Sequence, residues 1–414
     1  MKRPNQSILV VGFNTRPLAY SLYRAGLEVF AVDFFGDLDL FPYVKDCIII
    51  TKELDMRYEQ IKEDYKSYLA KYTIDLLRKY PNINYLLIGS GLDDALKERE
   101  MVLDYILKNN YQIINLNNDL EVIRQARDIR SIYQSLESED FKIPYTKPLI
   151  DFKKNQLDIS YPIILKKKSS SGGTNVYKIN RIEEFELQFN LINERDSIED
   201  WLIQEYIDGI PISCTVIANG KENQIISINR QIIGLKILNP PKDFIYCGNV
   251  VPSNLSNQDI VKISKLSSYL ARSLGLKGIN GFDFVLRDHE PFLMEINPRI
   301  PGSIRASEES LNLNLLFLHI ESFNYSKWNE IIEKLKNNKN QLFTTKLIIF
   351  APDDINIAKI KKINKIENVH DKTPPNEKIK KDQPICTILY KDQNYKKSYF
   401  GALKIADKVF QIIE

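Results

Sequence analysis

Apolar and polar positions alternate in blocks along the first 35 residues, and the blocks have the lengths of strands and of a helix. The apolar runs Ile8–Val11 and Val29–Val32 are followed by Gly12 and by Asp33, and residues 17–24 between them have a helical pattern. Two buried strands joined by a helix predict a parallel β-α-β unit, because parallel strands need a crossover connection. The chain is therefore predicted to begin with a Rossmann-like α/β domain.

Apolar runs of strand length, separated by polar segments, continue to about residue 117. The stretch NINYLLIGSGLDDA (82–95) has the pattern of a further buried strand that ends in a Gly-Ser-Gly turn, and Gln112–Leu116 that of another short strand. From about residue 118 a charged helix, DLEVIRQARDIRSIYQSL, replaces the apolar runs, and a turn with Pro144 and Pro148 follows it. A change of composition of this kind indicates a boundary, so the first predicted domain spans residues 1–117.

Asp33 follows Gly12 by about the spacing of a ribose-binding acid in a dinucleotide fold. The turn GFNTRP nevertheless holds one glycine where the dinucleotide fingerprint has three, which disfavours a nicotinamide-dependent oxidoreductase. Asn14, Thr15 and Arg16 follow the first strand, at the edge where open α/β sheets bind ligands. The alternative to dinucleotide binding is a scaffold of the same shape.

A small, hydroxyl-rich loop follows the apolar strand that contains Lys166. Its residues are Ser169, Ser170, Ser171, Gly172, Gly173 and Thr174. Backbone N–H groups and hydroxyls in such a loop can approach phosphate oxygens, and a lysine at its edge supplies countercharge. A flexible hairpin with solvated lysines is the other interpretation. The chain has no Gly-x-x-x-x-Gly-Lys-Ser/Thr motif, which excludes a Walker-type NTPase.

The segment DWLIQEYIDGIPISCTVIANG (200–220) is predicted to form a strand, a turn at Gly209 and a second strand at Ile212–Ala218. The first strand carries Gln204 and Glu205, and its backbone can present N–H and C=O groups to a purine edge.

The stretch GINGFDFVLRDHEPFLMEINPR (278–299) predicts a hairpin with chemistry on one face. Side chains alternate along a strand, so Glu295, Asn297 and Arg299 share one face and Asp283 can lie across from them. Two carboxylates and an amide oxygen are a ligand set for Mg²⁺ when substrate phosphates complete its shell. An arginine beside them can stabilise charge on a transferring phosphoryl group. The alternative, a surface hairpin, fits poorly with its dense apolar flanks.

Composition narrows the function classes. The 414 residues suggest about three domains, and a net charge of +3 gives no electrostatic case for nucleic acid or an anionic membrane surface. Four widely spaced cysteines indicate neither a zinc site nor a disulfide framework, and no apolar run has the length of a signal peptide core or of a membrane span. We expect a soluble cytoplasmic protein. The three histidines lie in no nucleophilic constellation, so no side-chain nucleophile is predicted.

In order and spacing, the Lys166 strand with its Ser/Gly loop, the strand at residues 204–207, and Asp283 followed by Glu295-x-Asn297-Pro-Arg299 resemble the ATP-grasp superfamily. VVGFNTRPLAYSLYRAG and AVDFFGDLDL are similar to its carboligase-like branch, and KIKKDQPICTIL to the terminal segment of that group. The resemblance covers nearly the whole chain. It implies a mixed α/β and α+β fold: an N-terminal Rossmann-like domain, a two-lobed ATP-grasp domain at residues 118–339, and a small C-terminal β-rich domain at residues 340–414.

The resemblance also implies roles for particular residues. Lys166 would contact the α- and β-phosphates of ATP, residues 169–174 would close over the triphosphate, and Gln204, Glu205, Tyr206 and Ile207 would line the adenine. Asp283, Glu295 and Asn297 would bind one or two Mg²⁺ ions, with Mn²⁺ as the alternative. Arg299 and Arg305 would face the γ-phosphate or an acyl-phosphate.

Two positions depart from the family pattern. Where many relatives have a basic residue after the aspartate near position 128, this chain has Ile129, so Arg127 or Arg130 substitutes or the contact is absent. Pro211 and Ile212 stand where relatives carry a ribose-binding acid, and Asp208 is a conceivable replacement.

The implied activity is an ATP-dependent ligase that activates a carboxylate as an acyl-phosphate and joins it to an amine or a similar nucleophile such as a thiol, and its partners would be small carboxylates and amines. A homodimer is left open. The alternatives are a phosphotransferase or a non-ligating ATP-binding protein of the same superfamily.

Overall fold

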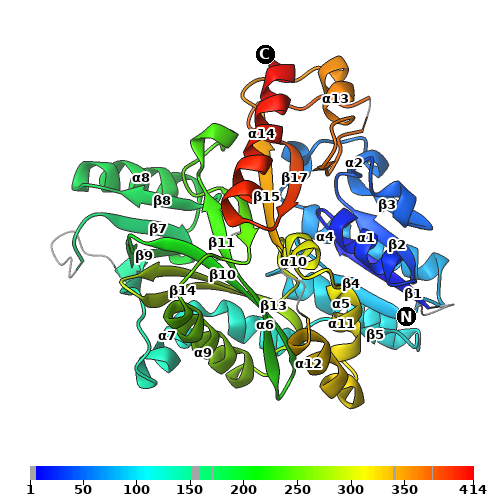
Figure 1. Cartoon of the computed structure of the whole chain (residues 1–414), viewed down its shortest axis with the longest axis horizontal. Helices are drawn as coiled ribbons and strands as arrows, with labels where there is room; N and C mark the ends of the chain where they lie inside the picture. Colours follow the sequence, from blue (N-terminus) through cyan, green and yellow to red (C-terminus); the bar gives the residue numbers. More distant parts are fainter. Residues whose placement is uncertain (1–5, 152–158, 169–171, 339–341, 375) are drawn as a thin grey trace.

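The computed structural model describes residues 6–151, 159–168, 172–338, 342–374 and 376–414 (Figure 1). The N-terminal region is a parallel five-stranded sheet in the order β3-β2-β1-β4-β5, which confirms the predicted Rossmann-like scaffold. Its strands are β1 (Ser7–Gly12), β2 (Glu28–Asp33), β3 (Asp46–Ile49), β4 (Tyr85–Ile88) and β5 (Ile114–Asn115). The strand predicted at residues 112–116 is thus reduced to two residues.

Helices cover both faces of this sheet. On one face, alternate residues of β1 such as Ile8 and Val10 pack on α1 (Arg16–Arg24) and on α11 (Leu315–Ser322) and α12 (Trp328–Lys336), which come from much later in the chain. On the other face, Leu9 and Val11 pack on α4 (Tyr65–Lys79) and α5 (Leu96–Lys108). The two short helices α2 (Ile50–Glu53) and α3 (Tyr58–Ile61) lie between β3 and α4 in the chain. A sheet buried on both faces accounts for the continuous apolar runs in its strands.

A small antiparallel sheet has the order β6-β9-β7-β8. Its strands are β6 (Thr146–Pro148), β7 (Ile163–Lys167), β8 (Val176–Ile179) and β9 (Trp201–Glu205), and α8 (Ile182–Arg195) packs on one face. The predicted strand at residues 204–207 therefore ends at Glu205. On the uncovered face, Lys166 lies opposite Leu202 in register and Ile164 lies opposite Gln204.

The largest sheet is antiparallel and has eight strands, in the order β14-β13-β10-β11-β12-β15-β17-β16. Its strands are β10 (Ile210–Asn219), β11 (Asn223–Ile233), β12 (Tyr246–Val251), β13 (Lys277–Arg287), β14 (Glu290–Asn297), β15 (Phe343–Phe350), β16 (Val369–His370) and β17 (Pro384–Asp392). Strands after residue 340 therefore continue the sheet that begins with β10. The domain boundaries proposed above stay predictions.

One face of this large sheet is covered by helices along its whole length. Helices α6 (Leu120–Arg127), α7 (Ile129–Ser138) and α9 (Asn257–Ser273) pack beneath β10, β13 and β14, whereas α13 (Ile357–Ile363) and α14 (Tyr395–Ile413) pack beneath β15 and β17. Helix α10 (Ile304–Leu311) lies against β12 and β15. None of the helices in the described residues is long and apolar enough to cross a membrane.

The charged helix predicted from residue 119 is in fact two helices. The break lies at Asp128, whose backbone is not helical and whose carboxylate accepts a hydrogen bond from the Ser131 backbone N–H as the N-cap of α7. An aspartate competes well for free N–H groups at a helix start, so an uninterrupted amphipathic pattern did not reveal the break.

Candidate functional site

The hairpin β13–β14 brings the predicted metal ligands together. Asp283 lies directly opposite Glu295, and Asn297 lies opposite Gly281. The Asn297 side-chain amide donates a hydrogen bond of 2.9 Å to Asp283 Oδ2, and the Gln231 side-chain amide donates one of 2.9 Å to Asp283 Oδ1. The spacing Asp283…Glu295-x-Asn297 therefore places two carboxylates and one amide around a common point.

The environment of Asp283 favours neutralisation of its charge. Burial raises the pKa of Asp283 to about 7, the negative charge of Glu295 adds to the rise, and Arg299 together with the two amide donors opposes it. Two carboxylates that share one site repel each other unless a cation lies between them. No three His, Cys, Asp or Glu side chains in the described ranges converge on a metal position. A Mg²⁺ ion held by Asp283, Glu295 and Asn297 would therefore need phosphate and water as its other ligands.

Arg127 binds the hairpin from the end of α6. Its Nε and Nη2 donate to the two carboxylate oxygens of Asp94 at 2.5 and 3.0 Å, and its Nη1 donates to Glu295 Oε1. Burial works against the charge of this guanidinium, but Glu295 and Asp94 outweigh it and raise the pKa of Arg127. The sequence left Arg127 and Arg130 as alternatives for the missing basic residue at Ile129, and Arg127 is the one that contacts the predicted metal ligands.

Arg299 makes a parallel contact with the N-terminal domain. Its Nε donates to Asp93 Oδ1, and both side chains are nearly buried, with exposed fractions of 14% and 11%. Asp93 and Asp94 follow β4 in the turn that the sequence marked only as Gly-Ser-Gly-Leu-Asp-Asp. Adjacent acids of one loop thus bind both arginines of the site, a feature that we did not predict because it depends on long-range contacts.

Arg305 lies in a different setting. It belongs to α10, where its Nη1 and Nη2 each donate at 2.6 Å to Glu308 and Glu309, and its guanidinium lies 4.3 Å from the centre of the Tyr20 ring. The structure does not bring it to the hairpin ligands. Its expected contact with phosphate stays a prediction.

Lys166 extends from β7 of the small sheet towards the hairpin. Its Nζ donates to the Met294 backbone carbonyl at 3.3 Å. Burial lowers the pKa of Lys166 to about 8, Glu295 opposes this, and Arg127 adds to it. The residue therefore lies in the same electrostatic cluster as Glu295 and Arg127, and its contact with phosphate stays a prediction.

The residues predicted to line adenine lie at the end of β9. Gln204 is buried and donates to Thr146 Oγ1 at 2.8 Å and to Tyr133 Oη at 3.2 Å. Glu205 pairs with Arg287 at 3.3 Å. Tyr206 and Ile207 follow the strand, with Lys178 3.7 Å from the Tyr206 ring centre and Ile207 buried.

Only part of the predicted phosphate loop can be located. Ser169, Ser170 and Ser171 lie outside the described residues. Gly172 and Gly173 have positive φ values of 66° and 79°, and a Cβ atom at Gly173 would lie 1.9 Å from the Phe244 carbonyl oxygen. The Thr174 carbonyl accepts a hydrogen bond of 2.8 Å from Lys242 Nζ. Gly173 is thus required by a close backbone approach between this loop and residues 242–246.

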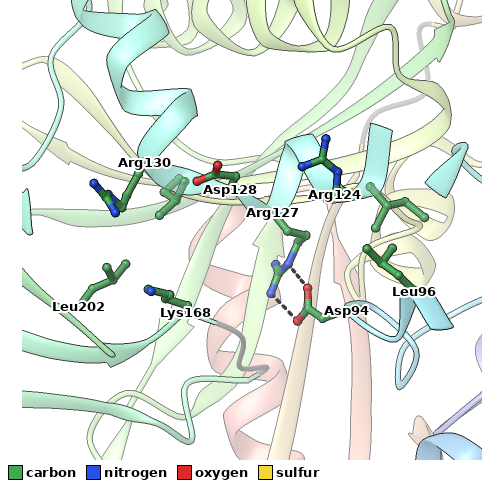
Figure 2. A pocket seen from close by; sticks show the side chains of 10 residues that line it. Asp94, Leu96, Arg124, Arg127, Asp128, Arg130, Lys168 and Leu202 are labelled. Carbon is green, nitrogen blue, oxygen red and sulfur yellow. Dashed lines mark hydrogen bonds and ion pairs between the residues drawn. The ribbon is translucent and has the colours of Figure 1, made fainter. Parts of the chain in front are cut away.

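A cavity of about 350 Å³ opens where the small sheet, helices α6 and α7 and the N-terminal domain meet (Figure 2). Figure 2 shows Arg127 pointing to Asp94, with Lys168 and Arg130 on the other side of the cavity. The lining residues are Asp94, Leu96, Ile123, Arg124, Arg127, Asp128, Ile129, Arg130, Lys168 and Leu202. Four of the ten are cationic and two are anionic. Arg127 is paired with Asp94 and Glu295, and Arg124 with Glu121, so the positive charge of the cavity comes mainly from Arg130 and Lys168.

Asp33, the candidate ribose-binding acid, has a local role instead. Its Oδ2 accepts from the Thr15 backbone N–H and hydroxyl, both at 2.7 Å. Its Oδ1 accepts from the backbone N–H groups of Phe35 and Gly36 at 3.0 and 2.7 Å. Four donors, two from Thr15 after β1 and two from the loop after β2, occupy this carboxylate, which removes the main support for the oxidoreductase alternative.

Comparison with known proteins agrees with this geometry. A family model described as an ATP-grasp domain matches residues 126–303. An uncharacterised protein of Methanocaldococcus jannaschii is 29% identical over 395 residues, which are 94% of this chain and 89% of that protein. A D-alanine–D-alanine ligase of Leptospira interrogans is 28% identical over 155 residues, 36% of this chain and 43% of the ligase, so the match spans less than half of that enzyme.

The fold has solved counterparts as well. The crystal structure of an L-amino acid ligase from Bacillus licheniformis superimposes with a TM-score of 0.69 at 16% identity and covers 98% of both chains. At that identity the likeness establishes the shared fold. Residues 126–303 therefore match an ATP-grasp domain, and the chain as a whole shares the fold of the L-amino acid ligase.

Proposed function

We propose that the chain is an ATP-dependent ligase that activates a carboxylate as an acyl-phosphate and joins it to an amine. The observation that carries the proposal is the convergence of Asp283, Glu295 and Asn297 with the cations Lys166, Arg127 and Arg299. Phosphoryl transfer needs positioning and charge neutralisation more than a side-chain nucleophile, and this site offers both. The similarity to a D-alanine–D-alanine ligase and to an L-amino acid ligase supports amine acceptors.

In the proposed reaction, ATP lies between the small sheet and the hairpin. Lys166 and the cationic cavity around Arg127, Arg130 and Lys168 neutralise the triphosphate. Asp283, Glu295 and Asn297 would hold Mg²⁺, which neutralises phosphate oxygens when bound. These residues orient the γ-phosphate for in-line attack.

The first step forms a bond between a carboxylate oxygen of the substrate and the γ-phosphorus, and the bond to ADP breaks. Arg299, held by Asp93, faces the charge that develops on the phosphoryl oxygens and can donate two hydrogen bonds to them. In the second step the amine nitrogen attacks the acyl carbon, phosphate leaves with the former carboxylate oxygen, and the nitrogen loses a proton. Both steps conserve atoms and charge without a covalent enzyme intermediate.

An isotope experiment tests this sequence. The protein is incubated with Mg-ATP and a panel of acids whose carboxylates carry ¹⁸O, with and without a panel of amines, and ADP and phosphate are measured. A ligase requires both an acid and an amine for sustained ADP release, and one ¹⁸O atom appears in the released phosphate. ADP formation with a single acceptor and no free phosphate would instead identify a phosphotransferase and refute the ligase proposal.

A matched pair of variants connects the activity to the hairpin. Glu295→Gln removes a predicted metal ligand, whereas Glu290→Gln changes an acid of the same strand that pairs with Lys262 away from the site. We expect Glu295→Gln to lose more than 100-fold in turnover, the scale of losing one electrostatic stabiliser. Glu290→Gln should keep the wild-type rate, and equal rates in both variants would contradict the assignment.

A further inference from the structure

The face of the large sheet that carries Asp283 stays polar well beyond the hairpin. Ser213 lies opposite Asp283, Asn229 lies opposite Ser213, and Gln231 is two residues further along the same face of β11. The series continues through Asn249, opposite Gln231, to Lys346, opposite Asn249. A polar row therefore crosses the strands from the predicted metal site to β15.

Asn249 and Lys346, at the far end of this row, are buried with unused donor capacity. Asn249 is fully buried, its Oδ1 accepts from the Tyr246 hydroxyl at 2.8 Å, and its Nδ2 has no hydrogen-bond partner among the described residues. Since Oδ1 faces the Tyr246 hydroxyl, Nδ2 on the other side of the amide is turned away from it. Lys346 is 9% exposed, and its Nζ donates at 2.9 Å to the Gly302 carbonyl. An ammonium group has three protons to donate, so this contact leaves capacity for a ligand.

Among the described residues, no carboxylate forms an ion pair with Lys346. Asp371 is bound by Arg16, whose Nε and Nη2 lie 2.8 and 2.6 Å from Asp371 Oδ1. Asp39 accepts the backbone N–H groups of Asp371 and Lys372 at 3.2 and 2.8 Å. Burial lowers the pKa of Lys346, with Asp371 opposing and Arg16 adding to the effect, so an anion in contact would offset the cost of a buried charge.

The N-cap of α10 and the strand β15 each add a buried hydroxyl group. Ser303 occupies the N-cap position, but its hydroxyl makes no capping bond and is buried without a partner. The hydroxyl of Thr344, two residues before Lys346 on the same face, is likewise buried without one. Helix N-termini favour negative charge, and α10 begins directly after the Gly302 carbonyl that binds Lys346.

From these observations we infer that Lys346 and Asn249 bind an anionic oxygen group, carboxylate or phosphate, at the end of the substrate remote from the reacting carboxylate. The inference rests on the proposed function for the identity of that substrate. Asn249 on β12 is three strand spacings from Asp283 on β13, about 14 Å at about 4.8 Å per strand. The substrate is thus an acid or an amine with a second, anionic end, and the polar row lies along its length.

The test measures anion binding without ATP or turnover, so it stands apart from the ligase assay. The probes are inorganic phosphate and glutarate at constant ionic strength, titrated by calorimetry against wild type, Lys346→Met, Lys346→Arg and Lys404→Met. Lys404 is an exposed lysine of α14 and controls for loss of one positive charge. Thermal melting of each variant, followed by circular dichroism, confirms that it is folded.

We expect Lys346→Met to weaken binding of at least one probe tenfold or more, Lys346→Arg to stay within about threefold of wild type, and Lys404→Met to match it. Phosphate bound in the cavity around Arg130 contributes equally to all four proteins and cancels. A preference for phosphate or for glutarate tells a phosphorylated substrate from a dicarboxylic one. The inference is overturned if wild type and Lys346→Met bind the probes with equal affinity, or if wild type binds neither probe. Failure of the isotope experiment alone refutes only the ligase proposal.

Discussion

Replacing Asp283 with asparagine should stabilise the protein above neutral pH while preventing metal-dependent activity. The pKa of Asp283 rises from 3.8 to about 7 on folding, because of burial and of the charge on Glu295. The folded state therefore holds a proton that the unfolded state has lost, and stability falls as pH rises from about 4 to about 7. A shift of about three units corresponds to about 4 kcal/mol at about 1.36 kcal/mol per unit.

That magnitude is an upper bound. Asp283 is only partly buried, so solvent screens its charge, and asparagine disturbs one of the two amide contacts at a cost of about 1 kcal/mol. We therefore expect Asp283→Asn to exceed wild type by about 2 kcal/mol at pH 8 and to lose this advantage at pH 5. Asp288→Asn, in the exposed turn of the same hairpin, is the matched control and should follow wild type.

The assay is urea unfolding followed by circular dichroism at pH 5, 6, 7 and 8, without magnesium. The difference between Asp283→Asn and wild type should widen as the pH rises. Curves that stay parallel across this range would show that Asp283 carries no buried charge, and the reasoning about the metal site would lose its electrostatic basis.

Three further predictions concern the nucleotide site. Because the pKa of Lys166 is lowered to about 8, wild type should bind Mg-ATP more weakly as pH rises from 7 to 9. By calorimetry, Lys166→Arg should bind with an affinity that does not change over this range. A wild-type affinity that is also independent of pH would contradict the contact of Lys166 with phosphate. Arg299→Lys should lower kcat more than tenfold and leave the KM for ATP within a few-fold, because a lysine cannot donate two parallel hydrogen bonds to a phosphoryl group. Asp93→Asn should reproduce part of that loss. A fall in melting temperature with a normal single-turnover rate would show that Arg299 has a structural role. Gly173→Ala should weaken ATP binding or lower the melting temperature by several degrees, since its Cβ would collide with the Phe244 carbonyl, and unchanged values of both would rule out the close approach.

Local patterns in the sequence were sufficient for the parallel N-terminal sheet and for the hairpin that carries Asp283 and Glu295. Both depend on the two-residue alternation of strands and on short connections, which the residues themselves encode. The contact of Arg127 with Glu295 spans 168 positions, and no local pattern indicates it. The same holds for Arg299 and Asp93, which are 206 positions apart.

The break at Asp128 and the end of β9 at Glu205 were missed for a different reason. Each is decided by competition between hydrogen bonds, at Asp128 between the helix and a side-chain cap. The spacing of apolar residues is almost the same in a continuous element and in one that breaks or ends, so the sequence pattern could not distinguish the two cases.

The two adjacent aspartates after β4 connect the two arginines of the site to one loop. Asp93 binds Arg299 and Asp94 binds Arg127, and successive Cα atoms are about 3.8 Å apart by covalent geometry. Both guanidinium groups are therefore bound by neighbouring residues of one loop, so a change in the length of that loop would affect both ion pairs together. Inserting one glycine between Asp93 and Asp94 would keep every ion-pairing group but increase the separation of the two aspartates. The spacing of the two arginines could thus be altered while their number and charge stay the same.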